Sequence, residues 1–178
     1  VHFSCEECER LGKAGVGICH CPTSNGVLAS GFCRTRELEA AGAPLGLGVD
    51  GSASNDGSNL MEELRHALLV NRLRYESATA VTARDVIRWA TQGSARCLGR
   101  SDIGTIAPGM QADLALYRLD ELRFSGAHDA VAALVLCGAH RADRVMVAGH
   151  WRVVDGAIPG LDLAALRRAH GAASRRYA

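Results

Sequence analysis

The sequence predicts an α/β fold in which short parallel strands alternate with helices, followed by a small β module. Two apolar runs, 15–19 and 45–49, are too short for helices and are bounded by turn residues, as buried strands are. Helical patterns separate and follow these runs. From Ser101 the hydrophobic period changes to two, which is typical of half-buried strands. We therefore expect one part over 1–100 and a second over 101–178.

Helix signals recur before residue 100. Ser4 and Glu7 have the spacing of a capping box, in which each side chain bonds the backbone of the other residue. The strongest pattern places Leu60, Leu64 and Leu68 on one apolar stripe. We expect helices over 5–14, 35–41 and 59–74, and one from Thr82 to a break at Gly93, with a further turn ending at Gly99.

The connections and the second part are expected to be less regular. Residues 21–26 contain a proline and an Asn-Gly pair, which predicts a loop. The apolar stretch 130–136 has a periodicity that favours neither strand nor helix. Residues 163–173, rich in Ala, Leu and Arg, predict a closing surface helix. We expect strands at 112–117, 145–147 and 151–154.

Composition and charge exclude several classes of protein. The 20 Lys and Arg residues nearly balance the 19 Asp and Glu residues and form no basic stripe, so nucleic acid is not an expected partner. The sequence contains no apolar run long enough to span a membrane and no signal peptide. Seven irregularly spaced cysteines favour reduced thiols in a cytoplasmic protein. The start at Val1, without Met, suggests a fragment.

We expect the chemistry to centre on Asp50, which directly follows the second apolar run. Catalytic side chains gather at the carboxyl ends of parallel strands, and His20 ends the first run. The two strand-helix units should therefore bring His20 and Asp50 to one edge, with Ser54 on the loop that follows. The alternatives are an Asx turn of Asp50 with Gly51 and Ser52, and a purely structural histidine.

Two further motifs compete with this interpretation. Residues 46–51 spell GxGxxG, but these glycines lie within the predicted strand and the next helix starts only near Asn59, which disfavours a dinucleotide site. A zinc-ribbon binding module is the second alternative, although the C-x-C spacing of its second pair is unlike the usual C-x2-C knuckle. Its ligands would be Cys5, Cys8, Cys19 and Cys21.

Two stretches resemble motifs of the amidohydrolase superfamily, in the branch of nucleobase deaminases and chlorohydrolases. They are His-Cys-Pro-Thr-Ser-Asn at 20–25 and Gly-Leu-Gly-Val-Asp-Gly-Ser-Ala-Ser-Asn-Asp at 46–56. The second is most similar to 8-oxoguanine deaminases and hydroxyatrazine-type aminohydrolases. Stretches 103–114 and 147–156 resemble the small β domain that follows the barrel. The resemblance implies the C-terminal portion of a (β/α)8 TIM-type barrel, then a small β-sandwich module and a C-terminal helix.

The resemblance also implies a metal-dependent hydrolytic deaminase. Its substrate would be an aminated heterocycle such as 8-oxoguanine, with a chlorohydrolase or aminohydrolase of triazine-like compounds as the alternative. Asp50 matches the aspartate after the eighth strand, which ligates one divalent metal, usually Zn²⁺, takes a proton from the activated water and helps return protons to the departing amine. Ser54, His20 and Asn25 are the expected substrate-binding residues, and Asn25 is also expected to fix the loop after the seventh strand.

The family's other metal ligands are not found at the matching positions. The His-x-His pair, the later histidines and the nearby glutamate would lie before Val1, so we expect that this stretch alone does not complete a metal site. An inactive relative that keeps the barrel without the chemistry is a third interpretation. The expected partners are a small heterocyclic substrate and water, with no nucleic acid and no membrane; a homo-oligomer is left open.

Overall fold

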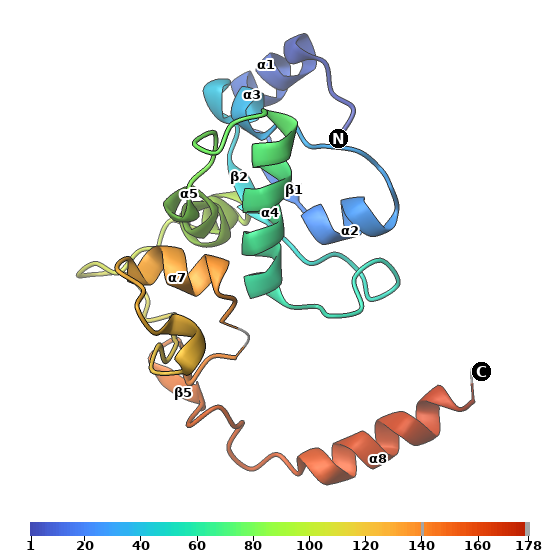
Figure 1. Ribbon diagram of the computed structural model, residues 1–178, viewed down its shortest axis with the longest axis vertical. Coiled ribbons are helices and arrows are strands. Elements are labelled where there is room, and N and C mark those ends of the chain that lie inside the picture. Colours follow the sequence, from blue (N-terminus) through green and yellow to red (C-terminus); the bar gives the residue numbers. More distant parts are fainter. Residues whose placement is uncertain (140, 177–178) are drawn as a thin grey trace.

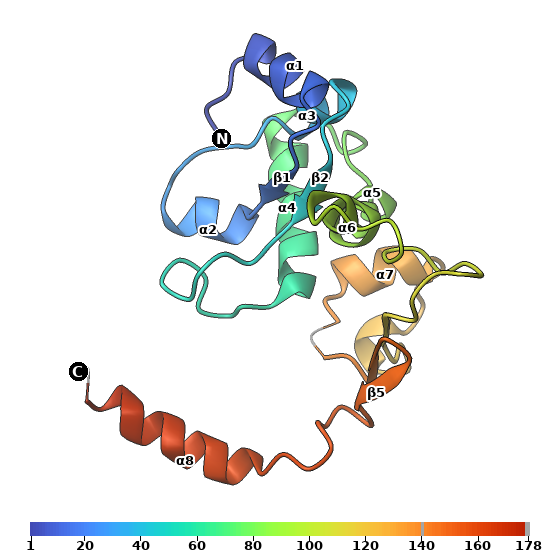
Figure 2. The same ribbon diagram turned by 180° about the vertical axis from the view of Figure 1, so that it is seen from behind.

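A computed structural model describes residues 1–139 and 141–176 as a mixed α/β chain (Figures 1 and 2). The helices are α1 (Cys5–Lys13), α2 (Pro22–Val27), α3 (Thr35–Ala40), α4 (Leu60–Arg74), α5 (Ala83–Arg88), α6 (Ser94–Cys97), α7 (Ala130–Leu136) and α8 (Leu163–Ser174), with a π-helical turn η1 (Trp89–Gly93) and a 3-10 turn η2 (Leu122–Phe124). The strands are β1 (Ile18–His20), β2 (Leu45–Leu47), β3 (Leu114–Leu116), β4 (Arg144–Val147) and β5 (His150–Val153).

Strands β1 and β2 pair in parallel, as the sequence predicts. Ile18 lies opposite Leu45, and His20 lies opposite Leu47. The connection between them carries α2 and α3, and α4 follows β2. Because the strands are parallel and in register, the segments that leave their carboxyl ends start side by side. This edge is where His20 and the loop with Asp50 emerge.

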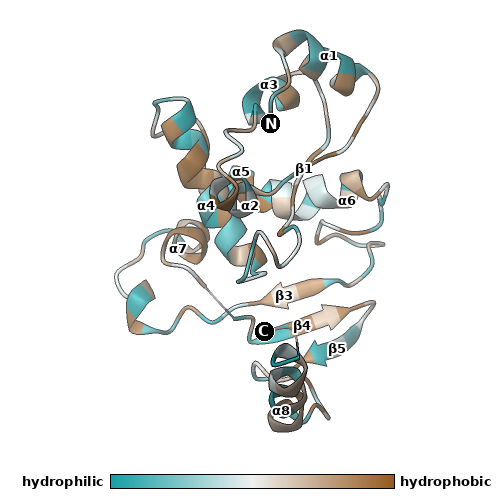
Figure 3. Cartoon of the chain, turned by 90° about the vertical axis from the view of Figure 1, so that its right-hand side faces the viewer, coloured by the Kyte–Doolittle hydropathy of each residue, from teal (hydrophilic) through white to brown (hydrophobic). Residues whose placement is uncertain are grey.

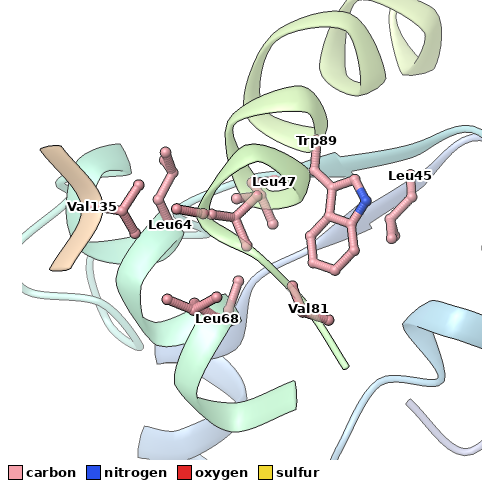
Figure 4. Packing of buried hydrophobic residues seen from close by; sticks show 10 residues of the cluster. Leu45, Leu47, Leu64, Leu68, Val81, Trp89 and Val135 are labelled. Carbon is pink, nitrogen blue, oxygen red and sulfur yellow. The ribbon is translucent and has the colours of Figure 1, made fainter. Parts of the chain in front are cut away.

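A buried core joins the strand pair to the helices that follow it. Figure 4 shows Leu47 of β2 near Leu64 and Leu68 of α4, with Trp89 between Leu47 and Leu45. Each fully buried leucine of this kind contributes about 1.5–3 kcal/mol to folding. Helix α4 also contacts α2, α5 and α7. Helix α4 therefore holds the strand pair and the surrounding helices together.

Most of the predicted elements are confirmed within a few residues. Helix α1 begins with the predicted capping box, in which Glu7 N donates to Ser4 Oγ at 3.1 Å and Ser4 N donates to Glu7 Oε2 at 2.7 Å. Helices α3, α4 and α8 and the β4–β5 pair lie where they were expected. The ambiguous stretch 130–136 is helix α7, and the side chain of Asp129 caps its first amides.

Two predictions in the first part are wrong. The expected loop 21–26 is largely helix α2, because Pro22 occupies the first turn of the helix, where its missing N–H is not needed. The expected break at Gly93 is absent, since η1 joins α5 to α6. A side chain at Gly93 would overlap the carbonyl oxygen of Leu45, so this glycine serves close packing of the helix on β2.

The second part contains a three-stranded antiparallel sheet in the order β3–β4–β5 (Figure 3). The described residues show one sheet here and not the two that a sandwich needs. Helix α8 extends away from this sheet, and none of its described side chains is buried (Figure 1). The expected part 101–178 includes positions 140, 177 and 178, which lie outside the described residues. None of the described helices is both long and apolar enough to cross a membrane.

Substituting Gly93→Ala should destabilise the protein by about 1–3 kcal/mol or more, because the added methyl group overlaps the Leu45 carbonyl in a packed contact. The free energy of unfolding in urea measures this effect. The matched control is Gly26→Ala in α2, where a methyl group meets no atom within 4 Å. Equal unfolding free energies for the two variants would show that the close approach at Gly93 has been misjudged.

Candidate active site

Asp50 lies at the carboxyl edge of the β1–β2 pair, three residues beyond the end of β2. Its side chain is exposed, and its backbone has a φ of 65°, in the left-handed region that few residues other than glycine adopt. Such backbone strain concentrates at functional sites, where the surrounding structure holds it in place. The conformation turns the chain sharply at the point where the apolar strand becomes a polar loop.

Three hydrogen bonds orient the carboxylate of Asp50. Gly51 N donates to Oδ1 at 2.8 Å, while the hydroxyls of Ser24 and Ser54 donate to Oδ2 at 2.6 Å and 3.2 Å. These bonds favour the ionised form and lower the pKa of Asp50, with the largest effect from Ser24. The Gly51 contact comes from the next residue and not from the amide two residues on that an Asx turn uses. Ser24 reaches Asp50 from α2, so the carboxylate joins two segments of the edge.

A buried glutamate on α4 holds the segments that supply these hydroxyls. Glu63 is fully buried; its Oε1 accepts from Asn55 Nδ2 at 2.6 Å and its Oε2 accepts from Thr23 N at 3.1 Å. Asn55 also donates to the carbonyl of Val49 at 2.8 Å. We call Glu63, Asn55 and Thr23 the Glu63 clamp. It ties the loop after Asp50 and the start of α2 to one helix.

The Glu63 clamp was not predicted from the sequence. Glu63 lies at i−4 from Ala67 on α4, so it falls within the apolar stripe and not on the solvent face. A carboxylate inside such a stripe is a signal for a buried polar contact. The partners, however, lie 8 and 40 positions away, and no local pattern identifies them.

The other predicted site residues take different positions. Ser54 is buried, and its hydroxyl contacts Asp50 and Ser24. His20 ends β1 as expected; it is 3% exposed, and burial lowers its pKa to about 4. Neither ring nitrogen of His20 has a hydrogen-bond partner among the described residues. Asn25 is half-buried on α2, and its backbone carbonyl accepts from Ser30 N at 2.9 Å, which closes the turn after this helix.

The residues flanking His20 are thiols that lie close to Asp50. Because strand side chains alternate, Cys19 and Cys21 project to the face opposite His20. The Cys21 thiol donates to Cys19 and lowers the pKa of Cys19 to about 7, whereas the pKa of Cys21 is raised. The charge of Asp50 acts on both thiols. From the sequence, these cysteines were predicted as reduced thiols, with zinc-ribbon ligands as the alternative.

The described residues contain no group of three or more His, Cys, Asp or Glu placed to hold a metal ion. A zinc site generally needs at least three protein ligands, so Asp50 supplies one suitable carboxylate and not a complete site. The zinc-ribbon hypothesis is wrong for this part of the chain, because Cys8 is buried with Cys33 while Cys5 is exposed. The dinucleotide hypothesis is also disfavoured, since only the first of the three glycines lies in β2 and the next helix, α4, begins only at Leu60.

The chain belongs to the amidohydrolase family, whose family model matches residues 1–152. This match confirms the superfamily resemblance of the two motifs. Over 174 residues the chain is 67% identical to an 8-oxoguanine deaminase of Pseudomonas aeruginosa, covering 98% of this chain and 38% of that protein. It is 37% identical over 178 residues to an isoxanthopterin deaminase from an unknown prokaryotic organism, covering 92% of this chain and 37% of the relative.

Solved structures of similar proteins share this fold. An adenosine deaminase from Xanthomonas campestris with bound zinc superimposes with a TM-score of 0.94 at 34% identity, over 98% of this chain and 40% of the other. An atrazine chlorohydrolase from Arthrobacter aurescens, in complex with zinc, gives a TM-score of 0.91 at 36% identity, over 97% and 39%. The chain therefore spans about two fifths of the length of the proteins that it matches.

Substituting Glu63→Gln should destabilise the protein by about 1–3 kcal/mol. The new side chain keeps one acceptor oxygen, so either Asn55 Nδ2 or Thr23 N loses a charged acceptor and faces the N–H₂ group of the glutamine. Faster hydrogen exchange of the amides in 51–58 should accompany the lower unfolding free energy. The control is Glu9→Gln on the exposed face of α1, which should change neither measurement. If hydrogen exchange in residues 51–58 is unchanged in the Glu63→Gln variant, the Glu63 clamp does not hold this loop.

Substituting Ser24→Ala should raise the pKa of Asp50, since it removes the strongest bond to the ionised carboxylate. The carboxyl ¹³C shift of Asp50, titrated by NMR in metal-free protein, gives this pKa directly. Ser52→Ala, in the same exposed loop, should leave the titration unchanged. An Asp50 pKa that is the same in the wild type and in Ser24→Ala would contradict the assignment of that bond.

Proposed function

We propose that the protein containing this chain is a metal-dependent hydrolytic deaminase of an aminated heterocycle, with 8-oxoguanine as its first candidate substrate. The observation that carries the proposal is the exposed carboxylate of Asp50, oriented by Ser24 and Ser54 at the carboxyl edge of two parallel strands. The 67% identity to an 8-oxoguanine deaminase favours this substrate over those of the more distant relatives.

The carboxylate of Asp50 suits two tasks in such a reaction. Hydrolytic deamination replaces the C–NH₂ group of the ring by C=O and releases ammonia, which requires that a water lose protons and that the departing amine gain one. A divalent metal, when bound, supplies charge that activates water. Asp50 would hold one position of that metal, accept a proton from the water and pass it toward the amine. Its lowered pKa keeps it ionised and able to accept this proton.

The remaining parts of the proposal extend beyond the described residues. Strands β1 and β2 would be the seventh and eighth strands of a (β/α)8 barrel over 1–100, and β3–β5 would belong to a small β-sandwich over 101–178. The other ligands of a Zn²⁺ ion would come from another part of the protein that contains this chain. We propose a cytoplasmic protein, in keeping with the absence of disulfides among its cysteines.

The proposed roles of the neighbouring residues follow from their contacts. Ser54 positions Asp50 through its hydroxyl and also lies at the edge where a substrate would sit. Asn25 fixes the segment after β1 through its backbone. His20, which is neutral at physiological pH because of its lowered pKa, would offer a ring nitrogen to the substrate or to a segment packed against β1. A homo-oligomer is compatible with these roles.

Substituting Asp50→Asn in the full-length protein should lower kcat for 8-oxoguanine by about 10²–10⁴-fold, because the amide cannot accept the proton. Ammonia release measures turnover, and elemental analysis measures bound metal. The control is Asp56→Asn, an exposed aspartate of the same loop, which should keep full activity. Normal turnover by Asp50→Asn with metal bound would refute the role of Asp50, and wild-type protein that carries metal but deaminates no ring would favour the inactive relative.

Hydrolysis of a triazine is the second candidate, because the fold matches an atrazine chlorohydrolase with a TM-score of 0.91. Parallel assays with 8-oxoguanine, hydroxyatrazine and atrazine separate the two candidates. We expect ammonia from 8-oxoguanine and no chloride from atrazine. Chloride release with a kcat/KM above that for 8-oxoguanine would reverse the assignment.

A further inference from the structure

Two thiols that the proposed reaction does not use converge on the site face of the strand pair. Cys19 of β1 and Cys21, the residue after β1, both place their sulfurs over Gly48. A methyl group at Gly48 would lie 2.5 Å from Cys19 Sγ and 3.3 Å from Cys21 Sγ. The Cys21 thiol also contacts the carbonyl of Cys19 at 3.9 Å. The two sulfur atoms are therefore close neighbours, held over one glycine.

Among the described cysteines, only Cys19 and Cys21 have sulfurs that lie near each other and are not buried. Cys8 and Cys33 share a core cluster, but they are only 1% and 6% exposed. Cys97 donates to carbonyls of the strand ends at 3.4 Å and 3.6 Å. By contrast, Cys19 is exposed and Cys21 is half-buried. In the described part of the chain, a reagent that needs two thiols at once can reach both of these sulfurs.

We propose that Cys19 and Cys21 form a dithiol site that takes trivalent organoarsenicals at the wall of the Asp50 site. An arsenic(III) oxide, R–As=O, condenses with two thiols: two S–H bonds and the As=O bond break, two As–S bonds form, and one water leaves. Arsenic stays in the +3 state, so no oxidant or reductant takes part. The product is a ring closed by the two sulfurs, which a single thiol cannot form.

The absence of a side chain at Gly48 makes room for this pair. Gly48 has no positive φ, so the backbone there accepts alanine, and the effect of Gly48→Ala comes from its methyl group. That methyl group would enter the space of the Cys19 sulfur and force the thiols apart. Gly48 is therefore the residue that sets the spacing of the dithiol.

Because the two thiols lie beside the Asp50 site, a bound arsenical should block the proposed reaction. Both sulfurs lie against Gly48, two residues before Asp50, so an aryl group on arsenic would lie beside the carboxylate. This consequence, loss of turnover on modification, rests on the proposed function. Formation of the adduct itself does not, because it requires only the two thiols.

The test treats full-length protein with one equivalent of phenylarsine oxide and follows the adduct by intact mass and peptide mapping. We expect one phenylarsenic per chain, bridging the peptide that holds Cys19 and Cys21, stable to excess monothiol and removed by 1,2-ethanedithiol. Cys19→Ser and Cys21→Ser should each weaken retention by about 10²-fold or more, because bidentate attachment becomes monodentate. Gly48→Ala should weaken it in the same direction.

The controls are Cys5→Ser and Cys137→Ser, which remove exposed single thiols and should leave the adduct intact. Retention of the adduct by the Cys19→Ser/Cys21→Ser double variant would overturn the proposal, as would wild-type binding no tighter than that of either single variant. The mass measurement does not depend on turnover. An inactive protein that forms the bridged adduct would therefore reject the proposed deaminase and support the dithiol site.

Discussion

The buried carboxylate of Glu63 constrains the whole edge on which Asp50 lies. A charge taken out of water is costly unless hydrogen bonds replace its hydration, and no Lys or Arg pairs with Glu63 in the described part of the chain. Its oxygens are satisfied instead by the amide of Asn55 and the backbone N–H of Thr23. The loop after β2 and the first turn of α2 must therefore stay docked on α4, or the carboxylate loses its partners.

The same docking brings the hydroxyls of Ser24 and Ser54 onto Asp50. They stabilise its charge without neutralising it, and no basic side chain pairs with it among the described residues. An ionised, exposed carboxylate with a fixed orientation is what a metal-assisted hydrolysis needs from this position. The left-handed backbone at Asp50 adds a local cost, which the bonds on both sides of the residue offset.

Local sequence patterns predicted the helices and strands more accurately than they predicted the contacts between these elements. Helices α1 and α4 and strand β2 follow from a capping box, an apolar stripe and a short buried run, all of which act within a few residues. Helix α2 was missed because proline and an Asn-Gly pair suit both a loop and a first helical turn. The continuation through Gly93 was missed because its cause is packing against Leu45, which is 48 positions away.

The site was predicted in the same uneven way. Asp50 and Ser54 were proposed as site residues from one loop and its family resemblance, and their side chains lie in contact. Ser24 and Glu63 were not proposed, since their link to Asp50 exists only once α2 and α4 have packed around β2. His20 and Asp50 were expected at one edge, and His20 ends β1 while Asp50 follows the end of the parallel strand β2. Strand alternation, which the edge argument did not consider, puts the thiols of Cys19 and Cys21 on the face opposite the imidazole.

The most direct test of the central claim is a crystal structure of the zinc-loaded, full-length protein. A carboxylate oxygen of Asp50 should lie about 2.0–2.2 Å from the metal, with Ser24 still bonded to that carboxylate and Glu63 still bonded to Asn55. A zinc ion held entirely by other residues, with Asp50 turned toward solvent while the Glu63 clamp is intact, would contradict it.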